Sequence, residues 1–239
     1  MKNVITKGAK LSGLPVTDTE LELINKQALE PLTSEQVFTF KIAVCDNEVD
    51  RDFEVFPRAT LEKMAPMFVG RTIMKDHQAK ADNQVARIYA TEVVGGTGTT
   101  KNGETYAQLV AHCYMVKTDS NADLITEIQA GIKREVSVGC SIGKAVCSIC
   151  GVDNREAYCK HWGGQEYDGK QCYFKLENPL DAYETSFVAI PAQRAAGTTK
   201  NYTGEEQKPE ETENTEQKDL IEAELGIIKS FIFSEKEGE

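Results

Sequence analysis

The segment at residues 120–141 most strongly constrains how this chain can fold, because it predicts a helix that stops and is followed at once by a strand. A capping pattern and an apolar stripe predict the helix over residues 120–130. Gly131 is a natural helix end, because glycine adopts the left-handed conformation that closes a helix. In the strand that follows, Ser137 and Gly139 share one face. Since Gly139 has no side chain, we expect a substrate backbone to approach closely there.

Runs of branched and aromatic residues predict that the middle of the chain is rich in strands. The strands are expected at residues 37–44, 71–75, 85–94, 105–116, 136–139, 170–176 and 182–190. Asn178 and Pro179 predict a turn between the last two strands. A short helix over residues 60–64 is expected to end near Pro66, because proline disfavours a helical residue before it. The pattern favours a mainly β fold with peripheral helices, of the α+β class.

The composition of the chain predicts its domain organisation and argues against nucleic-acid and membrane partners. The net charge of −11 argues against a nucleic-acid footprint, which needs a basic face. No apolar run approaches the ~18 residues of a membrane span, and no secretory signal is visible. We expect an arm over residues 1–34, which includes a weak amphipathic pattern, and a body over residues 35–196. Residues 197–239 are expected to form a largely disordered tail with a short helix, since residues 201–239 hold twelve acids and four lysines.

Ser137 is a candidate nucleophile, and a serine needs a base that removes its proton as it attacks. The chain has three histidines. His161 lies among cysteines and His112 lies within a strand. His77 instead follows a short strand at the start of a polar turn, a usual position for a catalytic side chain. The plainer interpretation of this pair is a half-buried strand serine and a surface histidine.

Three motifs occur in an order that resembles the prohead (capsid maturation) proteases of tailed phages, which share a fold with the herpesvirus assemblins. The sequence Met-Lys-Asp-His ends an early strand at His77, and Ser-Val-Gly begins at Ser137, six residues after a helix-ending glycine. Residues 184–192 then read Glu-Thr-Ser-Phe-Val-Ala-Ile-Pro-Ala. The likeness covers residues 37–196. The chain departs from the family pattern at Gln78, where an acid is common, and in a cysteine-rich insert.

The resemblance implies an assemblin-like antiparallel β-barrel and a serine endopeptidase that cleaves capsid and scaffold proteins, and itself, during phage head maturation. It implies Ser137 as the nucleophile, His77 as the base and Glu184 as the acid that orients the imidazole. The alternatives for the third catalytic residue are His112, Asp76 and Asp181, and the alternative nucleophile is Ser141. The substrates are then the major capsid protein and the scaffold, and the chain self-associates inside the assembling prohead, in the cytoplasm of the bacterial host.

A cysteine-rich insert at about residues 145–172 predicts a metal site. Its candidate ligands are Cys147, Cys150, Cys159 and His161, a set of soft and borderline donors that suits tetrahedral zinc. In a reducing cytosol a metal is favoured over disulfides, and no βαβ pattern supports a redox pair. Four protein ligands leave no open position for water, so we expect a structural zinc and no metal in catalysis. Cys172 is an alternative for one of the four ligands.

A function of another class also fits the sequence. The chain can be a zinc-stabilised structural or scaffold-associated protein of capsid assembly that has the protease fold without its activity. Self-cleavage that depends on Ser137 separates the two.

Overall fold

The computed structural model describes residues 16–193 and 195–199, and the elements below belong to these residues. The strands are β1 (Val37–Asp46), β2 (Glu54–Val55), β3 (Thr72–Lys75), β4 (Ala86–Thr99), β5 (Thr105–Val116), β6 (Val136–Cys147), β7 (Glu166–Tyr167), β8 (Lys170–Gln171), β9 (Phe174–Phe187) and β10 (Gly197–Thr199). The helices are α1 (Asp18–Asn25), α2 (Arg58–Phe68) and α3 (Ala122–Gln129), with 3-10 turns η1 (Ala81–Asn83) and η2 (Asp119–Asn121).

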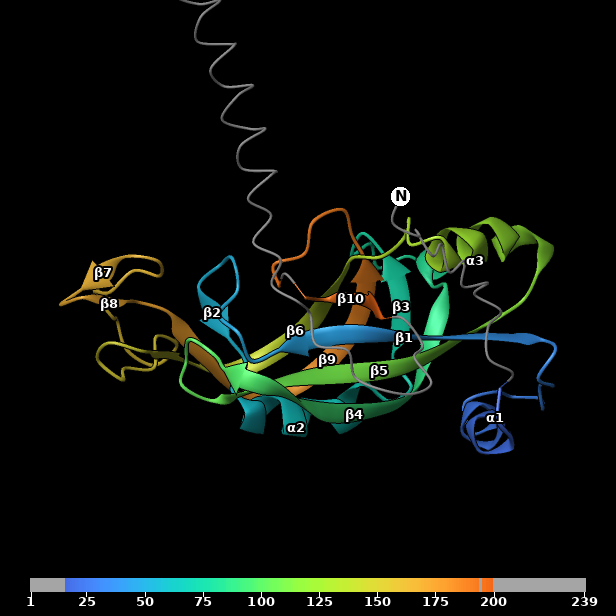
Figure 1. Cartoon of the computed structure of the whole chain (residues 1–239), viewed down its shortest axis with the longest axis horizontal. Coiled ribbons are helices and arrows are strands. Elements are labelled where there is room, and N and C mark those ends of the chain that lie inside the picture. The colour runs from blue at the N-terminus through green and yellow to red at the C-terminus, as the bar shows by residue number, and fades with distance from the viewer. Residues whose placement is uncertain (1–15, 194, 200–239) are drawn as a thin grey trace, which may run out of the picture. The chain divides into compact units, whose positions relative to one another are not determined.

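One mixed sheet of eight strands dominates the structure. Its order is β10-β1-β5-β4-β3-β9-β2, and β6 pairs with β9 off this path (Figure 1). The predicted mainly β fold with peripheral helices is therefore confirmed. The expected antiparallel β-barrel is not confirmed, because β2 and β3 pair parallel with β9 and, among the described strands, no ladder closes the sheet into a barrel. A single bridge between Glu135 and Gly197 joins the start of β6 to the start of β10.

The last long strand differs from the prediction of two strands and a turn. Strand β9 runs without interruption through Asn178 and Pro179. Asn178 has a φ of 54°, and the register with β6 shifts between Ser141 and Ile142, so the irregularity is a bulge. A bulge accommodates a proline inside a strand because the local ladder bond is already lost. Asn178 and Pro179, which were expected to form a turn between two strands, therefore lie at a bulge within one strand.

Helix α2 is longer than the helix expected over residues 60–64. It begins after Pro57, which occupies the N-cap, and continues through Pro66 to Phe68. Pro66 lacks the N–H that would bond the Glu62 carbonyl, which is a cost to the helix, but Leu61, Met64 and Phe68 are fully buried. This burial against the sheet outweighs the local preference of proline to end the helix.

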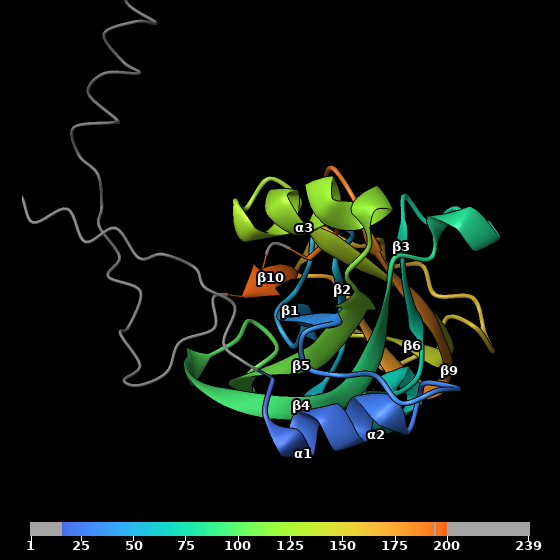
Figure 2. The ribbon, with the colours of Figure 1, turned by 90° about the vertical axis from the view of Figure 1, so that its right-hand side faces the viewer.

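Helix α1 is capped by Thr17, whose hydroxyl accepts a hydrogen bond from the Glu20 backbone N–H. It packs on the sheet through Ile24, which is fully buried beside Tyr89 and Tyr114. The described part of the predicted N-terminal arm is therefore a packed helix. Figure 2 shows α1 and α2 on the opposite side of the strands from α3.

The main core lies between the sheet and its helices. Its largest fully buried side chains are Ile42, Leu61, Met64, Phe68, Ile73, Ile88, Leu109 and Val136. Strand β10 continues the body past residue 196, where the tail was expected to begin. The predicted helical stretch of that tail, residues 219–233, lies outside the described residues. Among the described helices, none has the length and apolar character needed to cross a membrane.

Candidate functional site

Antiparallel pairing of β6 with β9 brings the candidate nucleophile beside the candidate acid. Ser137 lies opposite Ser186, and Gly139 lies opposite Glu184. Directly opposite residues of an antiparallel pair project from the same face of the sheet. All four residues therefore belong to one face, and the predicted alternation of Ser137 and Gly139 is confirmed.

His77 reaches this face through a tight turn after β3. Strand β3 runs parallel to β9, with Met74 opposite Ser186. Asp76 and His77 then adopt φ values of 54° and 53°, in the left-handed region that few non-glycine residues occupy. The turn directs the His77 backbone N–H to the Ser186 hydroxyl oxygen, 3.1 Å away. Such backbone strain is common where a site fixes one side chain.

The Glu184 carboxylate holds the imidazole and the strand together. Its Oε1 lies 2.7 Å from Nδ1 of His77, and its Oε2 accepts a hydrogen bond of 2.5 Å from the Ser186 hydroxyl. The Glu184 side chain is 9% exposed, whereas that of His77 is 41% exposed. Because a carboxylate only accepts hydrogen bonds, it favours the tautomer with the proton on Nδ1. That tautomer leaves Nε2 free to accept a proton.

Ser137 is half-buried and lies across the ladder from Ser186, which contacts both His77 and Glu184. Within the described residues the Ser137 hydroxyl makes no hydrogen bond, to His77 or to any other group. Catalytic hydrogen bonds are often long in the free enzyme and tighten only when substrate binds. The fold thus places Ser137 opposite Ser186, the hydrogen-bond partner of His77 and Glu184, without a hydrogen bond between Ser137 and His77.

The space over Gly139 is filled by the Glu184 side chain. A Cβ atom at Gly139 would lie 2.5 Å from Oε1 of Glu184. The expectation that a substrate backbone approaches closely over this glycine is therefore wrong. Gly139 instead leaves room for the carboxylate that holds His77.

The alternative residues have other partners. Asp181 lies 2.7 Å from the Arg71 guanidinium, and Nε2 of His112 lies 2.9 Å from Glu92. Asp76 supplies the turn before His77, and no described hydrogen bond joins the Asp76 carboxylate to the imidazole. Ser141 lies opposite Asp181, farther along β6. None of these groups makes a hydrogen bond or an ion pair with the His77 ring in the described structure.

A cleft of about 380 Å³ runs beside the first half of β6 and includes Ser137 in its wall. Its charged lining consists of Asp50, Asp52, Glu54 and Arg155. Burial, and then the neighbouring Asp50 and Asp52 carboxylates, raise the pKa of Glu54. Cys140 also lines the cleft, and burial raises the pKa of its thiol to about 11. A thiol held in its protonated form is a poor nucleophile, so Cys140 does not compete with Ser137.

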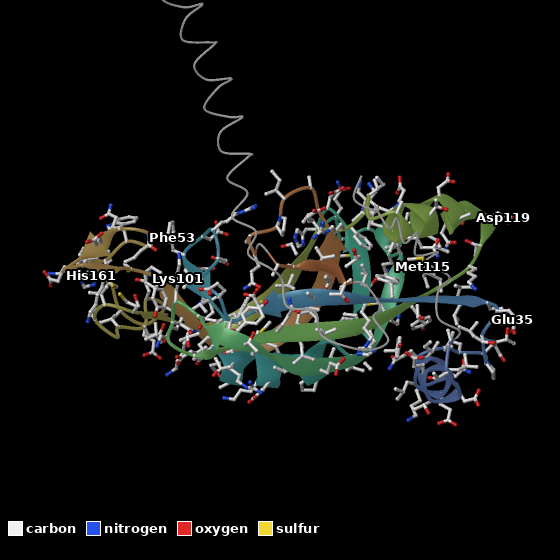
Figure 3. All side chains as sticks on the ribbon, in the orientation of Figure 1. Glu35, Phe53, Lys101, Met115, Asp119 and His161 are labelled. Atoms are coloured by element: carbon white, nitrogen blue, oxygen red, sulfur yellow. The ribbon has the colours of Figure 1, made fainter. Side chains whose placement is uncertain are left out.

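The predicted metal ligands come together at the end of the insert. One donor atom from each of Cys147, Cys150, Cys159 and His161 lies within 4.8 Å of the others, and this cluster could bind a metal ion. The Cys150 and Cys159 sulfurs are 3.5 Å apart, and Nδ1 of His161 lies 3.5 Å from Cys159 and 3.7 Å from Cys147. In Figure 3, His161 lies at the end of the molecule where Figure 1 shows β7 and β8.

Backbone amides support the cluster as they do in metal knuckles. The Ile149 N–H donates to the Cys147 sulfur, and the His161 N–H donates to the Cys159 sulfur, each over 3.4 Å. Burial raises the pKa of Cys147, but hydrogen bonds from the Cys150 and Ile149 N–H groups and from the Cys159 and Cys150 thiols together bring it below the usual value. Burial raises the pKa of the Cys159 and Cys172 thiols to about 11. A thiol with a lowered pKa is biased toward the thiolate that binds metals.

The insert also supports one wall of the cleft. Phe53 packs on Gly163 and Gly164, and a Cβ at Gly164 would lie 2.6 Å from the Phe53 ring. The Phe53 carbonyl also accepts a hydrogen bond from the Phe174 N–H, which attaches the acidic segment before β2 to the start of β9. Figure 3 shows Phe53 at the same end as His161. Arg155, from the insert itself, lines the same cleft.

Sequence analysis missed two residues that build this region. Ser186 joins His77 to Glu184, and its alternation with Glu184 in β9 was the available signal. Phe53 gave no signal, because its contact with Gly164 joins segments far apart in the chain.

Comparison of the chain with family models, with curated proteins and with solved structures found no match.

Proposed function

We propose that this chain is a serine endopeptidase of the prohead-protease type, with Ser137 as nucleophile, His77 as general base and Glu184 as the residue that positions His77. The observation that carries the proposal is the 2.7 Å contact between Nδ1 of His77 and Oε1 of Glu184, on the strand face that also carries Ser137. Nucleophile, base and orienting acid on one face form the arrangement that acyl transfer requires.

The mechanism follows from the tautomer of His77. Nε2 of the imidazole accepts the Ser137 proton as the serine oxygen attacks the peptide carbonyl. The resulting imidazolium is stabilised by Glu184 and donates its proton to the leaving amine. Water then replaces the amine, and the same imidazole activates it to hydrolyse the acyl-enzyme. Ser186 fixes the carboxylate during both steps through its 2.5 Å hydrogen bond.

The biological setting is part of the same proposal. The substrates are the major capsid protein, the scaffold and the chain itself, inside the assembling prohead in the cytoplasm of a bacterial host. The order of motifs around His77, Ser137 and Glu184 supports this family, and so does the topology. The isolated bridge between Glu135 and Gly197 brings the start of β6 beside β10, which is one end of the strand order, and this proximity is compatible with a barrel-like curvature of the sheet.

The metal is proposed to be a structural zinc held by Cys147, Cys150, Cys159 and His161. With Zn–S bonds of about 2.3 Å, tetrahedral geometry sets sulfur atoms about 3.8 Å apart. The measured spacing of 3.5 Å between Cys150 and Cys159 is close to this value. When bound, zinc supplies a cross-link that holds the insert, and the peptidase step uses only side chains of the β6–β9 face.

Self-cleavage and cleavage of co-expressed capsid protein, followed by mass spectrometry, test the proposal. The Ser137→Ala variant is expected to remain folded and to lose at least about 10³-fold in cleavage rate, because nucleophile removal leaves only binding and electrostatic effects. Ser141→Ala is the matched control, on the same strand, and should cleave as the original chain does.

Wild-type cleavage by Ser137→Ala would eliminate this nucleophile. If the unmodified chain stays intact, binds zinc and leaves capsid protein uncut, the non-catalytic scaffold-associated function becomes the better assignment.

A further inference from the structure

A fifth donor lies beside the four cysteine and histidine residues of the cluster. The Sγ atom of Cys172 is 3.9 Å from the Sγ atom of Cys147. Cys172 is fully buried and shares a small core with Cys147 and Cys159. Tetrahedral coordination at about 2.3 Å separates two thiolates by about 3.8 Å, so this spacing also fits a pair of ligands on one metal.

Nδ1 of His161 meets the same test. Bonds of about 2.3 Å to sulfur and about 2.05 Å to nitrogen set a ligand nitrogen about 3.5 Å from each ligand sulfur. The measured distances from Nδ1 are 3.5 Å to Cys159 and 3.7 Å to Cys147. Cys147, Cys150, Cys159 and His161 form the group whose donor atoms all lie within 4.8 Å of one another, and Cys172 lies beside this group with ligand-like spacing to Cys147. A tetrahedral ion takes four ligands. One donor is therefore in excess.

We propose that His161 and Cys172 are interchangeable fourth ligands of the metal. Cys147, Cys150 and Cys159 are the constant ligands, and either the His161 imidazole or the Cys172 thiolate completes the tetrahedron. The two differ in burial, since Cys172 is fully buried. His161 is half-exposed and its ring packs edge-on against Tyr167, with centroids 4.6 Å apart. The backbone of Cys172 is held by two hydrogen bonds, one from the Gly164 N–H to its carbonyl and one from its own N–H to the Gln165 carbonyl.

The exchange keeps the charge and proton balance simple. If Cys172 took the place of His161 on a bound ion, its thiol would give its proton to water and its thiolate would become a ligand as the imidazole left. No oxidation occurs, and the site gains one negative charge. The ion therefore stays bound when the more exposed imidazole leaves, so the insert keeps its cross-link.

Metal binding by single and double variants tests the proposal, and it does not depend on peptidase activity. His161→Ala and Cys172→Ser are each expected to weaken zinc binding less than about tenfold, because the other residue takes the fourth position. The double variant is expected to weaken it more than about 100-fold, a non-additive loss typical of residues that replace one another. Competition with a chromophoric chelator measures all four affinities. His112→Ala, a histidine outside the insert, is the control and should bind zinc as the original chain does.

Cobalt substitution gives a second measurement that holds even if the double variant does not fold. In His161→Ala loaded with Co²⁺, the thiolate-to-metal absorption should rise from three thiolates to four. Absorption that stays at three thiolates in this variant would overturn the proposal. So would a single variant, of either residue, that binds as weakly as the double variant, because the other residue would then be no ligand.

Discussion

At the scale of single residues, the candidate site depends on one buried carboxylate. Glu184 is 7% exposed and has two hydrogen-bonding neighbours, His77 and Ser186. Burying an acid is costly unless it is paired, and these contacts offset the cost. The same contacts fix the imidazole ring. They therefore both stabilise the buried Glu184 carboxylate and orient His77 as the base.

The Glu184→Gln variant tests whether Glu184 orients the His77 imidazole, and it leaves the Ser137 nucleophile in place. A glutamine can donate its amide proton to Nδ1, which favours the wrong tautomer of His77. We expect the rate of peptide cleavage to fall by about 10²- to 10⁴-fold with little change in folding. Single-turnover cleavage of a capsid-derived peptide measures it. Glu92→Gln is the matched control, since Glu92 also contacts a histidine. Equal losses in both variants would contradict a specific role for Glu184.

At the scale of elements, the pairing of β6 with β9 sets the geometry of the site. The register places Gly139 opposite Glu184, and the carboxylate occupies the space that a side chain at Gly139 would need. Gly139, the glycine of the Ser-x-Gly motif, therefore leaves room for the carboxylate of Glu184, which lies two residues before Ser186 on the paired strand. The pairing of β6 with β9 thus places Ser137, Gly139 and Glu184 on one face of the sheet.

Gly139→Ala tests this relation between the two strands. The new methyl group would meet Oε1 of Glu184 at 2.5 Å, so the carboxylate must move away from His77. Displacements of about 1 Å at a catalytic group can cost about 10²-fold in rate, and we expect kcat to fall by that much. Gly143→Ala is the control on the same strand. Its methyl group meets Asn178 at 2.5 Å, so it should lower stability and leave kcat unchanged. An unchanged kcat in Gly139→Ala would remove the proposed contact from the mechanism.

Glu54, the first residue of β2, makes stability depend on pH. The pKa of Glu54 is raised by burial and then by Asp50 and Asp52, so the folded state favours its protonated form. The stability contributed by this preference is present at low pH and is lost as the pH rises through the folded pKa. Glu54→Gln stays neutral, so it should be more stable than the original chain at pH ~7, and the gain should disappear near pH ~4.

Urea unfolding at both pH values measures this difference. Glu62→Gln, which removes an exposed partner of Arg58, is the control and should show no gain at neutral pH. A gain for Glu54→Gln that grows as the pH falls would contradict the assigned direction.

At the scale of the whole molecule, the sequence predicted the elements better than their limits and contacts. Branched and aromatic runs placed the strands, because burial on a sheet selects those residues. Local rules failed at Pro66 and at Asn178–Pro179, where packing and a bulge outweighed the preference of proline for ends and turns. The register of β6 on β9 and the contact of Phe53 with Gly164 join distant segments, and no local pattern contains them. The resemblance pointed to Glu184, whereas only the fold revealed Ser186.

The insert connects the metal cluster to the cleft, and metal removal tests this connection. Phe53 packs against Gly163 and Gly164 of the insert. Arg155, which also belongs to the insert, lines the cleft that includes Ser137. Chelation should loosen the insert, lower the melting temperature by at least about 4 °C for a loss of about 2 kcal/mol, and leave most of the sheet folded. Because the cleft wall moves while the β6–β9 face stays intact, KM should rise more than kcat falls.

Trp162 gives a direct readout of the insert, because it is the only tryptophan in the chain and follows His161. Its fluorescence should change on chelation, and addition of Zn²⁺ should reverse that change and the rise in KM together, whereas Mg²⁺ should reverse neither, since it prefers oxygen ligands. If chelation alters Trp162 fluorescence but leaves KM unchanged, the insert folds around its metal without supporting the cleft. The wall of the cleft would then depend on the pairing of β2 with β9 alone.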